Sequence, residues 1–190
     1  DAHVGERGVK LMKFRTAISI VSVQVAWLAC AYGAVSGYPS IGVATCMLAI
    51  AANLLASDDR WTLLVLSLLL GIYGGITESV WVHHSIISYS SPGPLPQFAP
   101  VWIVALWMAF AGLIYPAFSI LIGRPVAAAL LGATIAPWSY FAASQLGALE
   151  LSVPNANALL AIAAQWGLAL PAAVYVRELV SQKGTRCEGP

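Results

Sequence analysis

Six long apolar runs constrain the fold of this chain more than any other feature of its sequence. Each run is about long enough, at about 1.5 Å per residue, to carry an α-helix across a hydrocarbon core of ~30 Å. A bilayer offers no water to the open edges of a sheet, so the runs are predicted to be helices. The sequence therefore predicts an all-α membrane protein, a bundle of six transmembrane helices. The runs are Ala17–Ser36, Ile41–Ala56, Trp61–Val82, Val101–Ile122, Val126–Leu149 and Asn157–Val180.

Composition supports the membrane assignment and excludes one class of partner. The chain is 59% hydrophobic and only 9% charged, whereas a soluble domain has about 25% charged residues. Such a chain lacks the polar surface to face water on all sides. The net charge is +1, and no basic patch with interleaved aromatic residues occurs. We expect the lipid bilayer as the main partner and no nucleic acid.

All nine lysine and arginine residues fall on one side of a six-span bundle. By the positive-inside rule, both termini are then cytoplasmic. The predicted organisation is a cytoplasmic N-terminal segment at 1–16, one transmembrane domain at 17–180, and a cytoplasmic tail at 181–190. The basic residues are Arg7, Lys10, Lys13, Arg15, Arg60, Arg124, Arg177, Lys183 and Arg186.

Proline marks one connection and three of the predicted helices. The external segment Ser85–Pro100 is the longest connection, with four prolines and no charge, so a regular helix throughout is excluded. It is predicted to be a cap on the outer face, a shallow re-entrant loop or a plain connection. Pro116, Pro137 and Pro171 lie inside predicted helices, where we expect kinks. The kinks serve either packing or a cavity that needs the bent shape.

Glu78 is the only acid lying clearly within a predicted span. At about 100° per residue, Gly71, Gly74 and Gly75 share its face of the helix, and small residues allow a neighbouring helix to approach closely. Glu78 is therefore predicted to sit on a packed face of the bundle. Its expected partners are neutral: Gln24, Tyr115, Tyr140 or a trapped water. Three roles stay open, namely a structural hydrogen bond, a functional acid, or a residue that reaches water at the helix end.

Intramembrane polar residues tend to face the interior of a helix bundle and often mark functional sites. Glu78 is the candidate catalytic residue. Four tryptophans, Trp27, Trp107, Trp138 and Trp166, lie deep in the spans. They wall a hydrophobic cavity for an acyl chain or an isoprenoid, or else they fill space in a small bundle. The predicted ligand-pocket residues are Gln24, Asn53, Glu78, Tyr115, Trp138, Tyr140 and Gln165.

Neither a metal site nor a cofactor is expected. In a continuous helix, His83 and His84 point about 140° and 240° away from Glu78, whereas ligand pairs on a helix usually come at a spacing of three or four residues. The three cysteines show no metal-ligand spacing. Metalloprotease, nucleophile-elbow, phosphate-loop and dinucleotide-binding motifs are all missing from the sequence.

Several motifs, in order along the chain, resemble one known family. QVAWLACAYGAVSGYPSIG at 24–42 is similar to the family's first helix and turn, and GIYGGITES at 71–79 to its third helix. LWMAFAGLIYPAFSILIGRP and LLGATIAPWSYFAASQLGAL resemble helices four and five. Over 18–180 the chain resembles domain-of-unknown-function family 2878, a family of uncharacterised bacterial proteins. The resemblance implies a multi-pass protein of the bacterial cytoplasmic (inner) membrane.

Three classes of function stay open, and whether the protein is an enzyme is open with them. The first is an accessory protein or enzyme of membrane lipid modification, with an acyl chain bound among Trp107, Trp138 and Trp166 and with Glu78 as polar anchor or general acid. The second is a small proton-coupled transporter or permease. The third is a non-catalytic subunit of a larger complex, with a membrane-protein partner. The resemblance favours the first class, because relatives occur beside lipid-modifying enzymes.

Overall fold

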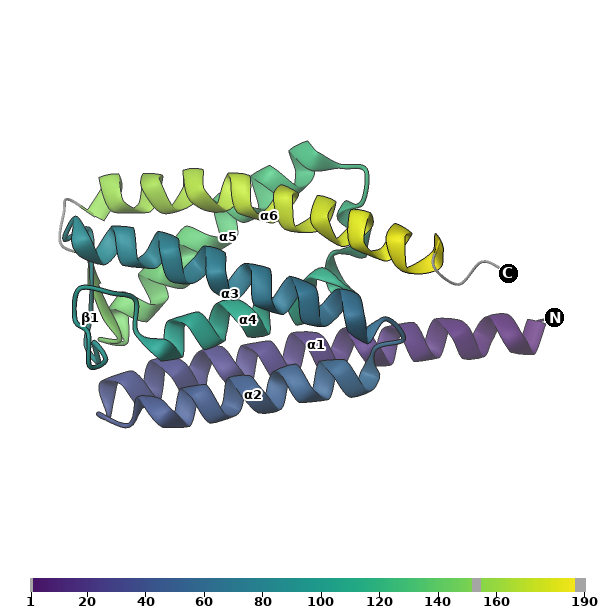
Figure 1. Ribbon diagram of the computed structural model, residues 1–190, viewed down its shortest axis with the longest axis horizontal. Coiled ribbons are helices and arrows are strands. Elements are labelled where there is room, and N and C mark those ends of the chain that lie inside the picture. The colour runs from purple at the N-terminus through teal and green to yellow at the C-terminus, as the bar shows by residue number, and fades with distance from the viewer. Residues whose placement is uncertain (1, 152–154, 187–190) are drawn as a thin grey trace.

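The computed structural model describes residues 2–151 and 155–186, and the side chains of residues 9–151 and 156–181. Within this part of the chain, α-helices run side by side along one direction (Figure 1). A short 3-10 helix and two short strands complete the fold. The elements are α1 (Ala2–Val35), α2 (Pro39–Ala56), α3 (Arg60–His83), β1 (Ile87–Tyr89), α4 (Val101–Ile114), η1 (Ala117–Leu121), α5 (Pro125–Gln145), β2 (Leu149–Leu151) and α6 (Asn155–Arg186).

The prediction of an all-α membrane architecture is confirmed. Five helices, α1, α2, α3, α5 and α6, are long and apolar enough to cross a membrane. Large apolar side chains cover their outward faces, as at Leu55 on α2 and Leu168 on α6. Such extended apolar surface marks contact with lipid or another apolar partner. The molecule therefore has the surface and the helix lengths of a multi-pass membrane protein.

The structure differs from the prediction at the fourth span, where the sequence predicts one kinked helix over Val101–Ile122. Helix α4 ends at Ile114 after 14 residues, and the chain continues past Pro116 as η1. Proline lacks a backbone N–H, and its ring clashes with the carbonyl group four residues earlier, which explains the break at this point. Pro137 and Pro171, by contrast, lie inside α5 and α6 as predicted. A sixth complete span is therefore not established by α4.

A two-stranded antiparallel sheet joins the two loops at one end of the bundle. Strand β1 lies in the proline-rich connection and pairs with β2, with Ser88 opposite Glu150. The same connection is tied to the helices, because Trp102 Nε1 donates to the carbonyl oxygen of Ser91 at 3.0 Å and the Ala99 N–H donates to Ser79 Oγ at 2.9 Å. The connection thus packs against the end of α3 and the start of α4, and its own residue Tyr89, on β1, is buried.

Helix packing divides the bundle into two parts, and the main direct helix contact between them is that of α3 with α6. Helix α1 packs on α2, and α4 packs on α1, α2 and α3, whereas α5 packs mainly on α6. Glycines allow the closest approaches: a Cβ atom on Gly42 would lie 2.7 Å from Cys30 Cα, and one on Gly132 would lie 2.3 Å from the carbonyl oxygen of Trp166. Side chains of α1 and α5 line a common cavity between the two parts of the bundle.

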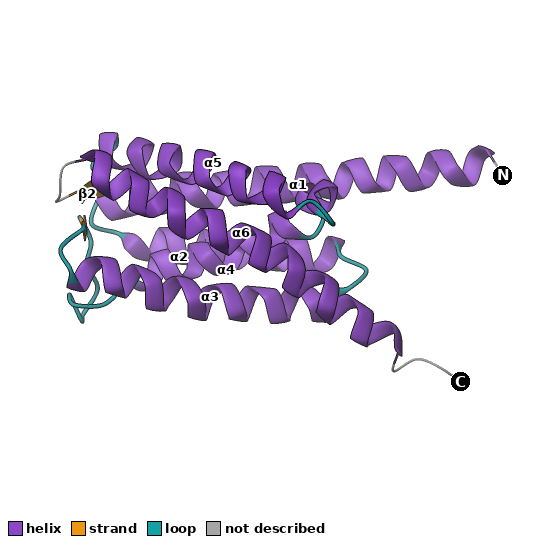
Figure 2. Cartoon of the chain, turned by 90° about the horizontal axis from the view of Figure 1, so that it is seen from above, coloured by secondary structure: helices purple, strands orange, loops and turns teal. Residues whose placement is uncertain are grey.

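Helix α1 begins and α6 ends at the end of the molecule opposite β1 (Figure 1). The N-terminal part of α1 extends well beyond the other helices (Figure 2). At this end, Arg15 donates two hydrogen bonds to Asp58 in the connection between α2 and α3. The predicted cytoplasmic location of this end stays a prediction from the basic residues. Cys187 lies outside the described residues.

Candidate functional site

Glu78 lies on the inward face of α3, as the spacing of its glycines predicts. Its side chain is 0% exposed, and Gly71 and Gly74 are buried on the same face. A Cβ atom on Gly74 would lie 2.1 Å from Trp107 Cγ, and one on Gly71 would lie 2.5 Å from Met108 Cγ. Only glycine therefore leaves room for α4 and its indole ring to pack beside Glu78.

Three donors from three different elements bind the Glu78 carboxyl group. The hydroxyl of Tyr89, on β1, donates to Oε2 at 2.6 Å. The indole N–H of Trp107, on α4, donates to Oε1 at 3.1 Å, and the hydroxyl of Tyr140, on α5, donates to the same oxygen. Buried polar groups in proteins are nearly always hydrogen-bonded. Here one side chain satisfies that requirement by joining α3, α4, α5 and the two-stranded sheet.

Among the predicted partners of Glu78, Tyr140 is confirmed, whereas Gln24 and Tyr115 lie elsewhere. Trp107 and Tyr89 were not predicted as partners. The sequence predicts that Trp107 walls a cavity or fills space, and it gives no indication of a hydrogen bond from the indole N–H. Tyr89 lies in a connection for which the sequence excludes a regular helix throughout and predicts no strand. The glycine opposite Trp107 is the one sequence signal that points to this contact.

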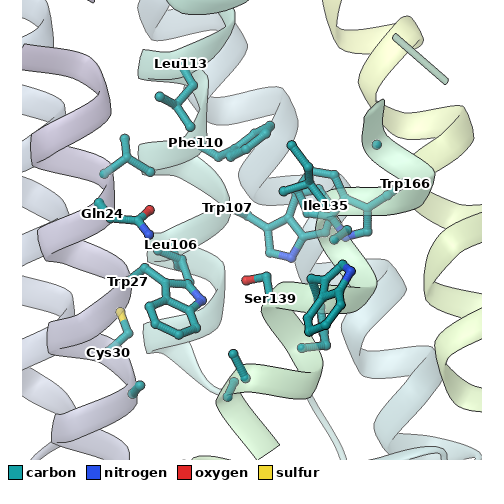
Figure 3. Close-up of a pocket in the computed structure, with 18 of the residues that line it drawn as sticks. Gln24, Trp27, Cys30, Leu106, Trp107, Phe110, Leu113, Ile135, Ser139 and Trp166 are labelled. Carbon is teal, nitrogen blue, oxygen red and sulfur yellow. The ribbon is translucent and has the colours of Figure 1, made fainter. Parts of the chain in front are cut away.

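A cavity of about 730 Å³ lies beside this cluster, with walls from α1, α4, α5 and α6. Figure 3 shows side chains of α1 on one side of it and side chains of α5 and α6 on the other. Along α1 it reaches from Thr16 to Ala31, which is about 22 Å at 1.5 Å per residue. That length covers much of a ~30 Å hydrocarbon core. Trp138 lines the cavity and is 72% exposed, so the cavity reaches the surface of the bundle there.

Aromatic side chains form a large part of the cavity wall, beside aliphatic ones. Trp107 stacks on Trp166 with ring centroids 4.3 Å apart, and Phe110 meets Trp166 edge to face at 4.9 Å. Tyr140 and Trp107 belong both to the cavity wall and to the Glu78 cluster, whereas Glu78 itself does not line the cavity. The aromatic residues of the wall are Trp27, Trp102, Trp107, Phe110, Phe118, Trp138, Tyr140 and Trp166.

The structure separates the predicted pocket residues into two groups. Gln24, Trp138 and Tyr140 line the cavity, whereas Asn53, Glu78, Tyr115 and Gln165 do not. The role of all seven in ligand binding stays a prediction.

Asn53 ties α2 to α1. It accepts a hydrogen bond from Ser19 at 2.5 Å and donates to Ser22 at 2.9 Å. These contacts hold two neighbouring helices together and leave Asn53 away from the cavity.

Gln165 and Tyr115 also make contacts away from the cavity. Gln165 Oε1 accepts a hydrogen bond from Trp81 Nε1 at 2.7 Å, which links α6 to α3. The guanidinium group of Arg177 lies over the ring of Tyr115, with Arg177 Cζ 4.6 Å from the centroid of that ring. This contact lies at the end of the bundle where α6 leaves it.

One residue of the cavity, Ser139, is among the polar residues that the sequence places inside the spans, but it was not among the predicted ligand-pocket residues. It follows Pro137 on α5 and points into the cavity between Gln24 and Trp166 (Figure 3). The sequence carries a weak signal for it, since a serine two residues after an intrahelical proline is a polar group inside an apolar run. Among the described residues, no three His, Cys, Asp or Glu side chains are grouped so that they could hold a metal ion.

One protein family matches the chain. Its description is "Protein of unknown function (DUF2878)", and the match covers residues 16–172. This confirms the family to which the sequence motifs pointed. No curated protein and no solved structure matches the chain.

Proposed function

The chain belongs to the DUF2878 family, and because that description names no function, we propose one from the site. The protein binds a lipid chain in the cavity between α1, α4, α5 and α6. It serves membrane lipid modification, as an accessory protein or as an enzyme. The setting is the bacterial inner membrane, with both termini cytoplasmic by the positive-inside rule.

One observation carries the proposal: an elongated cavity with aromatic and aliphatic walls, open at the surface that the bundle presents to lipid. Ligand sites are concave, mostly apolar, and carry few polar groups that fix the orientation of the ligand. Trp107, Trp138 and Trp166 all belong to the wall. An acyl or isoprenoid chain fits the length and the apolar character of this space.

Glu78 supports lipid binding indirectly, through hydrogen bonds to residues of the cavity wall. Its carboxyl group holds the hydroxyl of Tyr140 and the indole of Trp107, both of which line the cavity. It acts as a positioning residue, not as a group that touches the bound chain. A transporter coupled to protons through Glu78 has less support, because this side chain is fully buried and does not line the cavity.

The test is native mass spectrometry of the protein extracted gently from its own membrane. We expect the wild type to carry one defined hydrophobic molecule. Ile135→Trp fills the cavity with a larger side chain, since Ile135 points into it (Figure 3), and should lose that molecule. Cells that carry the wild type and cells that carry Ile135→Trp should then also differ in their lipid profiles.

Ile76→Trp is the matched control. Ile76 lies on α3, is 61% exposed and does not line the cavity, while Ile135 is 56% exposed. The control should keep both the bound molecule and the lipid profile. Equal retention by Ile135→Trp and Ile76→Trp would remove the support for chain binding. Loss of the molecule with an unchanged lipid profile would rule out lipid modification. A stoichiometric protein partner would instead indicate a subunit of a larger complex.

A further inference from the structure

Two polar side chains face each other across the cavity. Gln24 comes from α1 and Ser139 from α5, and Figure 3 shows the amide and the hydroxyl on opposite sides of the same space, with the indole of Trp27 nearby. Among the described residues, neither the Gln24 amide nor the Ser139 hydroxyl makes a side-chain hydrogen bond. Both groups are therefore free to bind a ligand.

Ser139 differs in this respect from several other hydroxyl groups on the helices, whereas Ser67 on α3 is likewise without a hydrogen bond among the described residues. A serine or threonine in a transmembrane helix normally donates to a carbonyl oxygen three or four residues earlier. Thr134 donates to Leu130 at 2.8 Å and Ser144 to Phe141 at 2.8 Å, both on the same helix as Ser139. Thr45, Thr77 and Ser79 do the same on other helices. The Ser139 hydroxyl has no such bond and lines the cavity instead.

The position of Gln24 sets the depth of this polar site. It lies about 14 Å along α1 from Arg15 and about 16 Å from Val35, at 1.5 Å per residue. That is close to the middle of a ~30 Å hydrocarbon core. A phospholipid keeps its ester oxygens near the interface and would place only hydrocarbon beside Gln24. A ligand that satisfies Gln24 must carry its polar group deep in the bilayer.

The charge of the cavity wall limits that polar group further. Among the residues that the structure describes, no lysine, arginine, histidine, aspartate or glutamate lines the cavity. An ionised group buried without a partner of opposite charge is strongly unfavourable. Gln24 and Ser139 each donate and accept hydrogen bonds, while the indole of Trp27 only donates. A neutral oxygen is the group that these three side chains can bind.

From these observations we infer that the cavity selects a neutral lipid with a carbonyl or hydroxyl oxygen at mid-bilayer depth, bound by Gln24 and Ser139. The inference rests on the proposed function and deepens it, because it names the chemical class of the bound chain. Gln24 and Ser139 become the specificity-determining residues of the site.

The test is a competition between two probes that differ only in the oxygen. Purified protein in detergent is mixed with equal amounts of 9-heptadecanone and heptadecane, and native mass spectrometry measures the occupancy of each. One hydrogen bond should favour the ketone by about three- to tenfold. Gln24→Leu and Ser139→Ala should each lower this ratio, and the double variant should bring it close to that of free partitioning into the detergent.

Ser144→Ala is the matched control, since the Ser144 hydroxyl is bonded to its own helix and does not line the cavity. It should leave the ratio unchanged. If both probes bind without preference, or if Gln24→Leu and Ser139→Ala keep the wild-type ratio, the inference is wrong while chain binding stands. If neither probe binds, the proposed function fails and the inference fails with it.

Discussion

Three hydrogen-bond donors surround the carboxyl group of Glu78, and each of them comes from a different element. Trp107 can only donate, so its contact requires an acceptor at Oε1. A buried donor that loses its acceptor costs about 1–3 kcal/mol. The Glu78 cluster therefore links the stability of the bundle to the shape of the cavity wall.

Substitution of Glu78 should reveal this dependence in graded form. Glu78→Gln keeps one oxygen for Trp107 and Tyr140 but places an amide nitrogen toward Tyr89, and should destabilise the protein by about 1–3 kcal/mol. Glu78→Leu removes the acceptor of all three donors and should cost more. Thermal unfolding in detergent measures both, with Ser144→Ala as control. Wild-type stability in Glu78→Leu would show that the cluster does not hold the helices together.

The sequence located Glu78 and the glycine face around it, because a helix repeats every 3.6 residues and the spacing can be read directly. It identified one of the three donors, Tyr140, and missed Tyr89 and Trp107. Those contacts depend on where a strand and a neighbouring helix lie in space. Local periodicity carries no information about that placement.

At the scale of elements, glycine decides how closely α3 and α4 approach. Gly74 faces the indole of Trp107, whereas a Cβ atom on Gly75 would meet only Val104 Cγ2 at 3.5 Å, an ordinary contact. The two residues are neighbours in the sequence, and the expectation that both share the packed face of Glu78 holds for Gly74 but not for Gly75, which is only partly buried. They form a matched pair for testing the packing of these helices.

Gly74→Ala should destabilise the protein by about 1–3 kcal/mol, because the added methyl group overlaps a ring that cannot move without breaking its bond to Glu78. Gly75→Ala should be neutral or slightly stabilising, since alanine favours a helix over glycine by about 1 kcal/mol. Thermal unfolding of both variants in the same detergent checks the prediction. Equal stability of the two would contradict the packing of Trp107 on Gly74.

The ion pair between α1 and the connection before α3 gives a pH-dependent contribution. The Arg15 guanidinium group lowers the pKa of Asp58 below its ordinary value. A carboxyl group with a lowered pKa stabilises the folded state above its unfolded pKa of about 3.9, and that contribution is lost as the pH falls through the lower folded value. Asp58 is 74% exposed, so the contribution is small and sensitive to salt.

Asp58→Asn should therefore be less stable than the wild type at pH 7 and at pH 5 in low salt. The difference should shrink below about pH 4, as the wild-type carboxyl group takes up its proton. Thermal midpoints of both proteins across this range provide the measurement. A difference that does not change with pH would mean that the ion pair does not contribute.

At the scale of the whole molecule, the fold places the start of α1 and the end of α6 at the same end of the bundle, opposite the small sheet (Figure 1). The basic residues predict that this end faces the cytoplasm. The chain offers a natural reporter, because Cys30 and Cys46 are buried, while Cys187 belongs to the predicted cytoplasmic tail. Gln97, in the connection between β1 and α4, is exposed at the opposite end.

A membrane-impermeant maleimide should label Gln97→Cys in intact cells and leave Cys187 unlabelled. Cys187 should react once the membrane is permeabilised, and Cys187→Ser identifies its signal. Labelling of Cys187 from outside, with Gln97→Cys protected, would reverse the orientation. Labelling of both in intact cells would show that the number of spans is odd.

The sequence by itself determined that the chain is a helical membrane protein, where most of its helices lie, and which of their faces are packed. Hydrophobic length, helical periodicity and proline act locally, so they can be read residue by residue. Only the tertiary structure decided that Tyr89 and Trp107 reach Glu78, and that Gln24 faces Ser139 across a cavity. These features depend on contacts between segments far apart in the chain. The close packing of glycines against an indole ring or a backbone carbonyl group determines which side chains meet there.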